Sequence, residues 1–289
     1  MIKKLTLLAS LILLGSSINA QVYKGVLING QNGTPVEFTN VGIVRKNIGT
    51  VSNRHGQFEL RIPAEHLRDS IRFSMIGYEP VTLLVSDFIN RSNDTIFMKE
   101  KPYSIRELVI IPTGPRIMIL GNSRKGPWAF HSLGSFDNKG MEAGVILDPK
   151  NNTVLLKTIT LNDVMFEVSD NGRNIGLTTG QDTMLLRINL YHVNSRNEFE
   201  NILTQPVYIK IDGDNNYYLK KFDISEHNLV IDSKVLLTLE YFDEVFTRTK
   251  IRINGTFFGP DSYVRRTSQG SWQKLSGSLG IFVETLTLK

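Results

Sequence analysis

The sequence predicts an all-β protein built from two β-sandwiches. Short segments of alternating apolar and polar residues recur along the chain, and this period of two is that of a strand with one buried face. Asn-Gly and His-Gly pairs separate several of these segments, where glycine can adopt a positive φ and close a turn. The chain has 289 residues, of which 41% are hydrophobic and 21% charged. That composition provides enough apolar material for one or two domains with their own cores.

The first twenty residues have the features of an export signal. Lys3 and Lys4 form a basic start, residues 5–14 are mostly apolar, and residues 16–20 are small or polar. The apolar run is too short to span a bilayer, and no other long apolar run follows it. We therefore expect residues 1–20 to be a signal peptide and the mature, exported chain to have no transmembrane span.

Charge and cysteine content exclude several functions. Without Lys3 and Lys4, 31 basic side chains face 28 acidic ones, which leaves a net charge of only +3. This weak balance, without an arginine-rich helix, argues against a nucleic-acid partner. Cysteine is absent, which excludes disulfides, thiolate metal sites, a cysteine nucleophile and a lipidated cysteine. An exported all-β protein without disulfides is more typical of a bacterial envelope than of eukaryotic secretion.

Seven short strands are expected in the N-terminal part of the mature chain. In residues 58–62 (FELRI), the apolar side chains would point to one face and the charged ones to the other. Residues 63–67 are expected to form a single helical turn. The predicted strands are residues 22–27, 37–45, 50–52, 57–62, 70–75, 81–85 and 94–98.

Residues 22–98 also carry motifs in a specific order. These are Lys24-Gly25-Val26, Thr34-Pro35-Val36, Asn40-Val41-Gly42-Ile43, Gly49-Thr50-Val51-Ser52-Asn53, Gly56-Gln57-Phe58-Glu59-Leu60 and Ile71 to Tyr78. The region resembles the carboxypeptidase regulatory-like domain, a small prealbumin-like sandwich. Asn53 stands where that family often has aspartate, which argues against a cation there. The resemblance implies an accessory scaffold and no peptidase activity.

The next segment, residues 99–127, is predicted to be a linker because Pro102, Pro112 and Pro115 and scattered charges interrupt the pattern. Its one strongly apolar piece, residues 108–111, is expected to be a strand that joins one of the sandwiches. The start of a TonB-dependent receptor could look similar. That class needs many further barrel strands, and the chain that follows is too short to supply them.

Residues 128–289 are predicted to form the larger sandwich, because their strand count is roughly that of a two-sheet jelly roll. The predicted strands are residues 144–147, 153–161, 163–168, 183–192, 205–211, 216–223, 235–241, 250–253 and 280–288, with a long polar loop at residues 195–201. The stretches 185–190, 202–203, 206–207, 222–225, 235–240 and 263–272 resemble a β-sandwich that follows this module in exported proteins of Gram-negative bacteria. That resemblance implies a periplasmic, outer-membrane surface or secreted location and no established reaction.

No catalytic, metal or cofactor site is predicted. The five histidines are scattered without a metal-ligand spacing, and no serine stands in a nucleophile elbow. Asp212-Gly213-Asp214 is interpreted as a hairpin turn, because a calcium loop would place glutamate at position 223, which is aspartate. The acidic clusters Asp212 with Asp214, and Glu240 with Asp243 and Glu244, leave a carbohydrate-active hydrolase as the alternative.

Exposed aromatic rings that stack on sugars are the main binding candidates, although core packing is the simpler explanation for any one ring. Trp272 is expected to be exposed because it follows Gly270-Ser271 in a polar stretch. Arg265 and Arg266 could bind acidic sugars or carboxylates of a partner, or be solvated loop charges. The predicted binding residues are Trp272, Tyr217, Tyr218, Trp128, Arg265 and Arg266.

Two hypotheses follow. The favoured one is a non-catalytic envelope or cell-surface protein that binds a glycan or another envelope protein through the larger sandwich, with the N-terminal module as scaffold. The alternative is a hydrolase whose carboxylates converge only in three dimensions. Two carboxylates about 5 to 9 Å apart in a cleft would favour the hydrolase, and an aromatic surface without such a pair would favour the binding protein.

Overall fold

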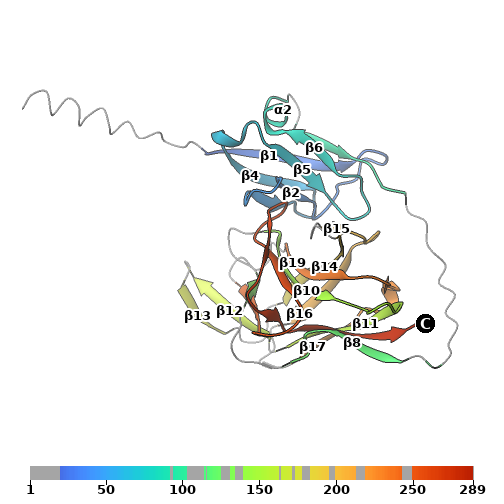
Figure 1. The fold of residues 1–289 in the computed structure, drawn as a ribbon. Helices are drawn as coiled ribbons and strands as arrows, with labels where there is room; N and C mark the ends of the chain where they lie inside the picture. The colour runs from blue at the N-terminus through green and yellow to red at the C-terminus, as the bar shows by residue number, and fades with distance from the viewer. Residues whose placement is uncertain are drawn as a thin grey trace, which may run out of the picture.

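A computed structural model describes most of the mature chain, in residues 20–91, 94–102, 114, 116–124, 131–133, 139–162, 164–170, 173–177, 183–194, 199–212, 219–242 and 249–288. The predicted signal peptide falls outside these residues except for its last position, as does the apolar piece 108–111. Within the described residues the chain is all-β, with small N-terminal sheets followed by larger, curled antiparallel sheets (Figure 1). No described helix has the length and apolar character needed to cross a membrane.

Two small sheets form the N-terminal module. The three-stranded sheet has the order β4-β1-β7, in which β1 runs parallel to β7, and the four-stranded sheet has the order β3-β2-β5-β6. The strands are β1 (Ala20–Asn29), β2 (Asn40–Ile43), β3 (Gly49–Val51), β4 (Gln57–Pro63), β5 (Ser70–Ser74), β6 (Val81–Leu84) and β7 (Thr95–Met98).

The core of the module follows the alternation seen in the sequence. Phe58, Leu60 and Ile62 on β4 are buried, whereas the residues between them are exposed. The expected helical turn is the 3-10 helix η1 (Ala64–His66), and the sequence pattern missed one short helix, α2 (Val85–Ile89). All seven strands predicted for this region are present, with ends that differ by a few residues.

The larger region contains a seven-stranded sheet and a five-stranded sheet. The first has the order β15-β14-β19-β10-β22-β23, with β16 also paired to β14, and the second has the order β17-β11-β25-β8, with β18 also paired to β11. The seven-stranded sheet contains β10 (Met141–Leu147), β14 (Thr183–Val193), β15 (Phe199–Asn201), β16 (Val207–Asp212), β19 (Val235–Tyr241), β22 (Ser262–Arg265) and β23 (Trp272–Lys274). The five-stranded sheet contains β8 (Ile117–Gly121), β11 (Val154–Leu161), β17 (Lys220–Asp223), β18 (Val230–Ile231) and β25 (Ile281–Thr287).

Two further sheets lie in the same region. One has the order β13-β12-β20-β9, and the other pairs β21 with β24. A one-turn 3-10 helix, η2, lies between β17 and β18. The bounds are β9 (His131–Leu133), β12 (Val164–Asp170), β13 (Arg173–Leu177), β20 (Thr249–Ile253), β21 (Gly255–Thr256), β24 (Ser278–Leu279) and η2 (Ser225–His227).

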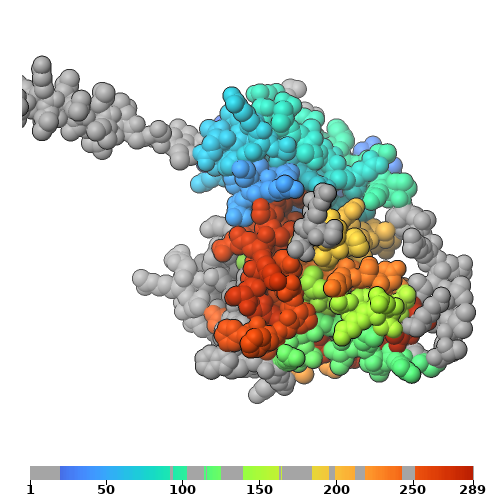
Figure 2. Space-filling model, in the orientation of Figure 1, coloured from blue at the N-terminus to red at the C-terminus, as the bar shows by residue number. Residues whose placement is uncertain are grey.

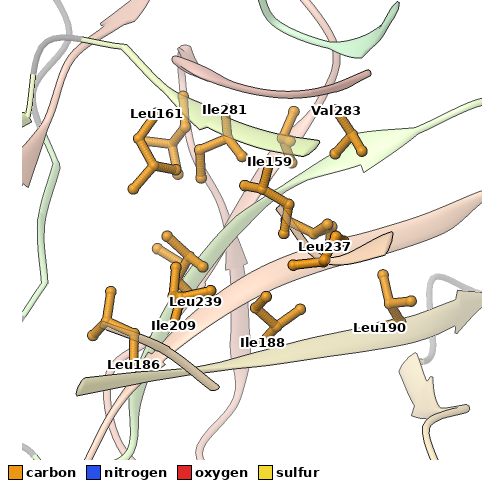
Figure 3. Close-up of a cluster of buried hydrophobic side chains, with 14 of the residues drawn as sticks. Ile159, Leu161, Leu186, Ile188, Leu190, Ile209, Leu237, Leu239, Ile281 and Val283 are labelled. Atoms are coloured by element: carbon orange, nitrogen blue, oxygen red, sulfur yellow. The ribbon is translucent and has the colours of Figure 1, made fainter. Parts of the chain in front are cut away.

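The main core lies between the two largest sheets. Figure 3 shows Leu186, Ile188 and Leu190 of β14 on one side, with Ile281 and Val283 of β25 on the other. These side chains are almost fully buried, and full burial of an aliphatic side chain of this size is worth about 1.5–3 kcal/mol. The core therefore fixes which face of β14 points inward, and the opposite face is left for other contacts.

Two segments differ from their predicted assignments. Strand β8 lies inside the predicted linker 99–127 and pairs with β25, so the sheets of the larger region include residues well before Trp128. Residues 199–201, within the predicted polar loop 195–201, form β15 at the edge of the seven-stranded sheet. In β8 the exposed Ile117 and Ile119 are as apolar as the buried Leu120, and β15 has only three residues, so neither strand shows a period of two.

Candidate binding cleft

The outer face of the seven-stranded sheet is polar where its inner face is apolar. On β14, Leu186, Ile188 and Leu190 enter the core, so Arg187 and Asn189, between them, point to the other side. These two polar residues are nevertheless buried, with exposed fractions of 1% and 2%. Another part of the molecule must therefore cover this face. That part must supply ion-pair and hydrogen-bond partners for the charged groups and pack against the apolar groups.

Four charged residues form a row across that face. Arg187 is paired in register with Glu240 of β19, Glu240 with Glu142 of β10, and Glu142 with Arg265 of β22. Arg187 Nε donates to Glu240 Oε2 at 2.9 Å, and Arg265 Nη2 donates to Glu142 Oε2 at 2.7 Å. The order across the sheet is therefore Arg, Glu, Glu, Arg. Each arginine neutralises the carboxylate next to it.

Neighbouring polar groups complete this row. Asn189 Nδ2 donates to Glu240 Oε2 at 2.8 Å and also to Glu142 Oε1, so one amide joins the two carboxylates. Tyr191 Oη donates to Glu142 Oε1 at 2.8 Å, and Thr238 Oγ1 does so at 3.1 Å. Buried charges are tolerated only when they are paired and hydrogen-bonded, and Glu142 meets that condition most fully.

The two carboxylates have opposite pKa shifts. Burial raises the pKa of Glu142 above its ordinary value, with a further increase from the adjacent Glu240 charge and an opposing effect from Arg265. Burial acts in the same direction on Glu240, but Arg187 and Arg265 outweigh it and leave the pKa of Glu240 below its ordinary value. As the pH falls, Glu142 is therefore protonated before Glu240.

An aromatic side chain, Trp272, lies beside the Arg265 end of the charged row. Trp272 stands opposite Arg265 on β23, and the Arg265 guanidinium lies 4.9 Å from the centre of its ring. The ring also makes edge contacts with Tyr191 at 5.4 Å and Phe199 at 5.3 Å. Phe199 in turn contacts Tyr263 at 5.0 Å. Trp272 is half-buried by these contacts.

The N-terminal module covers the other end of the row. Arg187 Nη1 donates to the backbone oxygen of Phe38 at 2.7 Å, and Phe38 has a φ of 51°, in the left-handed region. The Phe38 ring lies 4.5 Å from the ring of Phe242. The charged row of the larger sandwich is therefore tied to the module through a main-chain group.

A second contact joins the module to the loop after β22. Ser268 Oγ donates to Asn40 Oδ1 at 2.5 Å, and Gln269 Nε2 donates to Ser74 Oγ at 2.7 Å. Gly42 and Gly49 are paired on β2 and β3, and a Cβ at either would overlap with the Ser268 carbonyl oxygen. Figure 2 shows this C-terminal segment in red against the blue and cyan module. The two glycines of the N-terminal motif thus allow a close backbone approach.

A cleft of about 460 Å³ remains between the module and the larger sandwich. This volume is in the range of small-ligand sites. The module lines it with Arg72, Ser74, Tyr78 and Lys101, among others, and the larger sandwich lines it with Arg187, Asn189, Tyr191, Phe199, Asn201 and Arg265, among others. The cleft combines basic groups, amides and aromatic rings, which suits an anionic ligand that also has hydroxyls or a flat apolar face.

The predicted binding residues have different outcomes. Arg265 lines the cleft from within a strand and is buried in an ion pair, so it is not a solvated loop charge. Trp272 packs behind the cleft wall and is half-buried rather than fully exposed. Arg266 is exposed and is not among the cleft-lining residues. Tyr217, Tyr218, Trp128 and Asp214 lie outside the described residues, and Asp212 is the last residue of β16.

Several cleft and network residues were not anticipated from the sequence. The alternation of residues 183–192 predicts a polar face that carries Arg187, Asn189 and Tyr191. It does not predict which part of the chain covers that face. The sequence indicates Glu240 only as part of an acidic cluster with Asp243 and Glu244. No sequence motif marks Glu142 as a candidate site residue. Among the described residues, no cluster of metal-ligating side chains occurs.

Comparison with known proteins identifies the module. Residues 23–110 match the model of the CarboxypepD_reg-like domain. The chain therefore contains a CarboxypepD_reg-like domain. The match begins one residue after the start of the predicted range 22–98, continues to residue 110, and ends before the larger sandwich. A search of curated proteins found no match.

Solved structures were also compared. The VP2 subviral particle of infectious bursal disease virus is 11% identical, with 92% of this chain and 62% of that chain covered and a TM-score of 0.25. The Gt strain of the same virus gives 11% identity, 92% and 63% coverage and a TM-score of 0.25. This chain spans less than two thirds of the length of these viral chains. With TM-scores of 0.25, these structures support no conclusion about the fold or function of this chain.

Proposed function

We propose that this protein is a non-catalytic, exported envelope or cell-surface protein that binds a glycan or another envelope protein in the cleft beside its larger sandwich. The observation that carries the proposal is the cleft itself, which both parts of the chain line and whose inner end is formed by a buried, hydrogen-bonded charge network. Such a network holds its side chains in fixed positions, as a specific binding site requires.

The position of the two carboxylates favours binding over hydrolysis. Glu142 and Glu240 are neighbours with opposite pKa shifts, as an acid and base pair would be. However, both are completely buried and neither lines the cleft. Each also carries an arginine partner, whereas a glycosidase acid must reach the glycosidic oxygen. The groups that do reach the cleft are donors and rings that can hold a ligand.

The module has an active part in this proposal. It contributes one wall of the cleft through Arg72, Ser74 and Tyr78, so it is more than a passive spacer. The exported location rests on the signal-like residues 1–20, and a Gram-negative envelope is the setting that fits a cysteine-free, all-β exported chain. A glycan is the preferred ligand, because mixed amide and aromatic linings suit sugar rings.

The proposal is tested by blocking the cleft. Glu200 is an exposed residue of β15 that lines the cleft, so Glu200→Trp should fill the opening without disturbing the core. Glu226→Trp, at another exposed glutamate, on η2, is the matched control. Mature parent and variants are compared on a glycan array and in affinity capture from the native envelope.

We expect the parent and Glu226→Trp to retain the same ligands and Glu200→Trp to lose them. Retention of every ligand by Glu200→Trp would place binding elsewhere and overturn the proposal. Release of reducing sugar from a bound glycan by the parent, abolished in Glu142→Gln, would instead support the hydrolase.

A further inference from the structure

The basic groups of the cleft are only partly neutralised. Glu240 and Glu142 balance Arg187 and Arg265, respectively. Arg72 and Lys101 also line the cleft, and neither has an ion pair with any described residue. Among the described residues that line the cleft, Glu200 is the single acidic one. The cleft thus has an excess of positive charge on the side contributed by the module.

Two guanidinium groups have buried donors without an acceptor. Arg72 Nε and Arg265 Nε are both shielded from solvent, and neither has a hydrogen-bond partner in the described part of the chain. Arg265 itself is about nine-tenths buried. Leaving such a donor unsatisfied costs about 1–3 kcal/mol, and because both atoms are shielded from solvent, a ligand acceptor would reach them only if the arginine side chains turned toward the cleft.

The two arginines approach the cleft from opposite sides. Arg72 lies two residues before Ser74 on β5, so both point away from the module core. Ser74 accepts the hydrogen bond of Gln269, which follows Arg265 in the loop after β22. The bond from Gln269 to Ser74 therefore brings the wall that carries Arg72 against the wall that carries Arg265.

From this arrangement we infer that the cleft binds the carboxylate of an acidic sugar. The inference rests on the proposed function and names the chemical class of its ligand. A carboxylate matches the planar donor pattern of guanidinium groups, and Lys101 adds a further positive charge to the lining. Asn201 and Gln269 can bond to sugar hydroxyls, while Tyr78 and Phe199 add aromatic rings to the lining. A neutral sugar would leave the positive charges of Arg72 and Lys101 without a counter-charge.

The test uses acidic oligosaccharides, each beside its carboxyl-reduced form. Binding of these probes to the mature protein is measured by calorimetry for the parent, Arg72→Gln, Lys101→Gln and the control Arg266→Gln. Arg72 and Arg266 both lack a described ion pair, so neither change exposes a buried charge, and circular dichroism checks that each variant folds. Glu200→Trp is included to report whether the cleft is the site.

We expect the acidic form to bind and its carboxyl-reduced form to bind at least about tenfold more weakly, since a charged hydrogen bond is worth about 1.5–3 kcal/mol. Arg72→Gln should weaken the acidic form by a similar factor, and Arg266→Gln should not. Equal binding of acidic and reduced forms, unchanged affinity in Arg72→Gln, or binding of acidic peptides alone would overturn the inference. If the acidic-sugar inference fails but Glu200→Trp abolishes the binding of neutral sugars, the proposed function survives. If Glu200→Trp leaves the binding of neutral sugars unchanged, the proposed function fails together with the inference.

Discussion

Glu142 and Glu240 stand directly opposite each other on β10 and β19, and a single Asn189 amide donates to both carboxylates. Like charges in such a position repel, so the pair is stable only because an arginine lies on each outer side. Both arginines line the cleft, and Arg187 also joins the sandwich to the module through the Phe38 carbonyl.

The first prediction concerns Arg187. Arg187→Met removes the partner of a fully buried Glu240 and the bond to the Phe38 carbonyl, so the free energy of unfolding should fall by about 3–5 kcal/mol. The double variant Arg187→Met with Glu240→Leu should recover much of that loss, because it leaves no unpaired charge. Urea unfolding measures both. Equal stability of Arg187→Met and the parent would show that the ion pair is not buried as described.

The second prediction concerns pH. Because the pKa of Glu142 is raised, the folded chain holds this proton more tightly than the unfolded chain does. The resulting stabilisation is present below the ordinary glutamate pKa and is lost as the pH rises through the raised value. The stability of the parent relative to Glu142→Gln should therefore fall as the pH rises from the ordinary glutamate pKa through the raised value.

Glu240 provides the opposite sign as a control. Its lowered pKa gives stability that is present above the ordinary glutamate value and lost as the pH falls toward the lowered one. The parent should therefore lose stability relative to Glu240→Gln on acidification. Urea titrations across the pH range report both slopes, and slopes of the same sign would contradict the assignment of the two carboxylates.

The third prediction concerns the contact between module and sandwich. Gly49→Ala would push a methyl group into the Ser268 carbonyl oxygen and should cost about 1–3 kcal/mol, the usual range for overpacking. Hydrogen exchange should speed up in the loop that contains Ser268. Gly30→Ala is the control, because its added methyl would have 3.5 Å to the nearest atom. Similar exchange in both variants would count against the close approach.

The fourth prediction concerns Trp272. Trp272→Ala removes the contacts with Tyr191, Phe199 and the Arg265 guanidinium. Because the ring is only half-buried, we expect a loss of about 1–3 kcal/mol, below the usual cost for a core tryptophan. Trp272→Phe should retain most of the stability. Thermal unfolding measures both, and a Trp272→Ala variant as stable as the parent would show that the ring does not support the cleft wall.

The strands were predictable because each buries one face. The period of two in β4 and β14 is a local property, and it fixed most strand positions in the module and many in the larger sandwich. Strand β22 was not visible, because all four of its residues are buried and its pattern therefore does not alternate. Arg265 at its end consequently looked like a loop charge.

The cleft could not be predicted for a different reason. Glu142 and Glu240 meet across strands about a hundred residues apart, and the cover over Arg187 comes from Phe38 in another part of the chain. No local pattern encodes such pairings. The motif with Gly42 and Gly49 did mark a real constraint, but its cause, the approach of Ser268, is visible only in three dimensions.

In the proposed function, the ligand lies between the module and the larger sandwich. Hydrogen exchange of the mature protein, with and without an oligosaccharide that binds on the array, tests it most directly. We predict slower exchange in residues 72–78 of the module and residues 199–203 of the sandwich together, since both line the cleft. Protection confined to one of these walls, or to a distant surface such as the exposed Phe257 and Phe258, would contradict the claim.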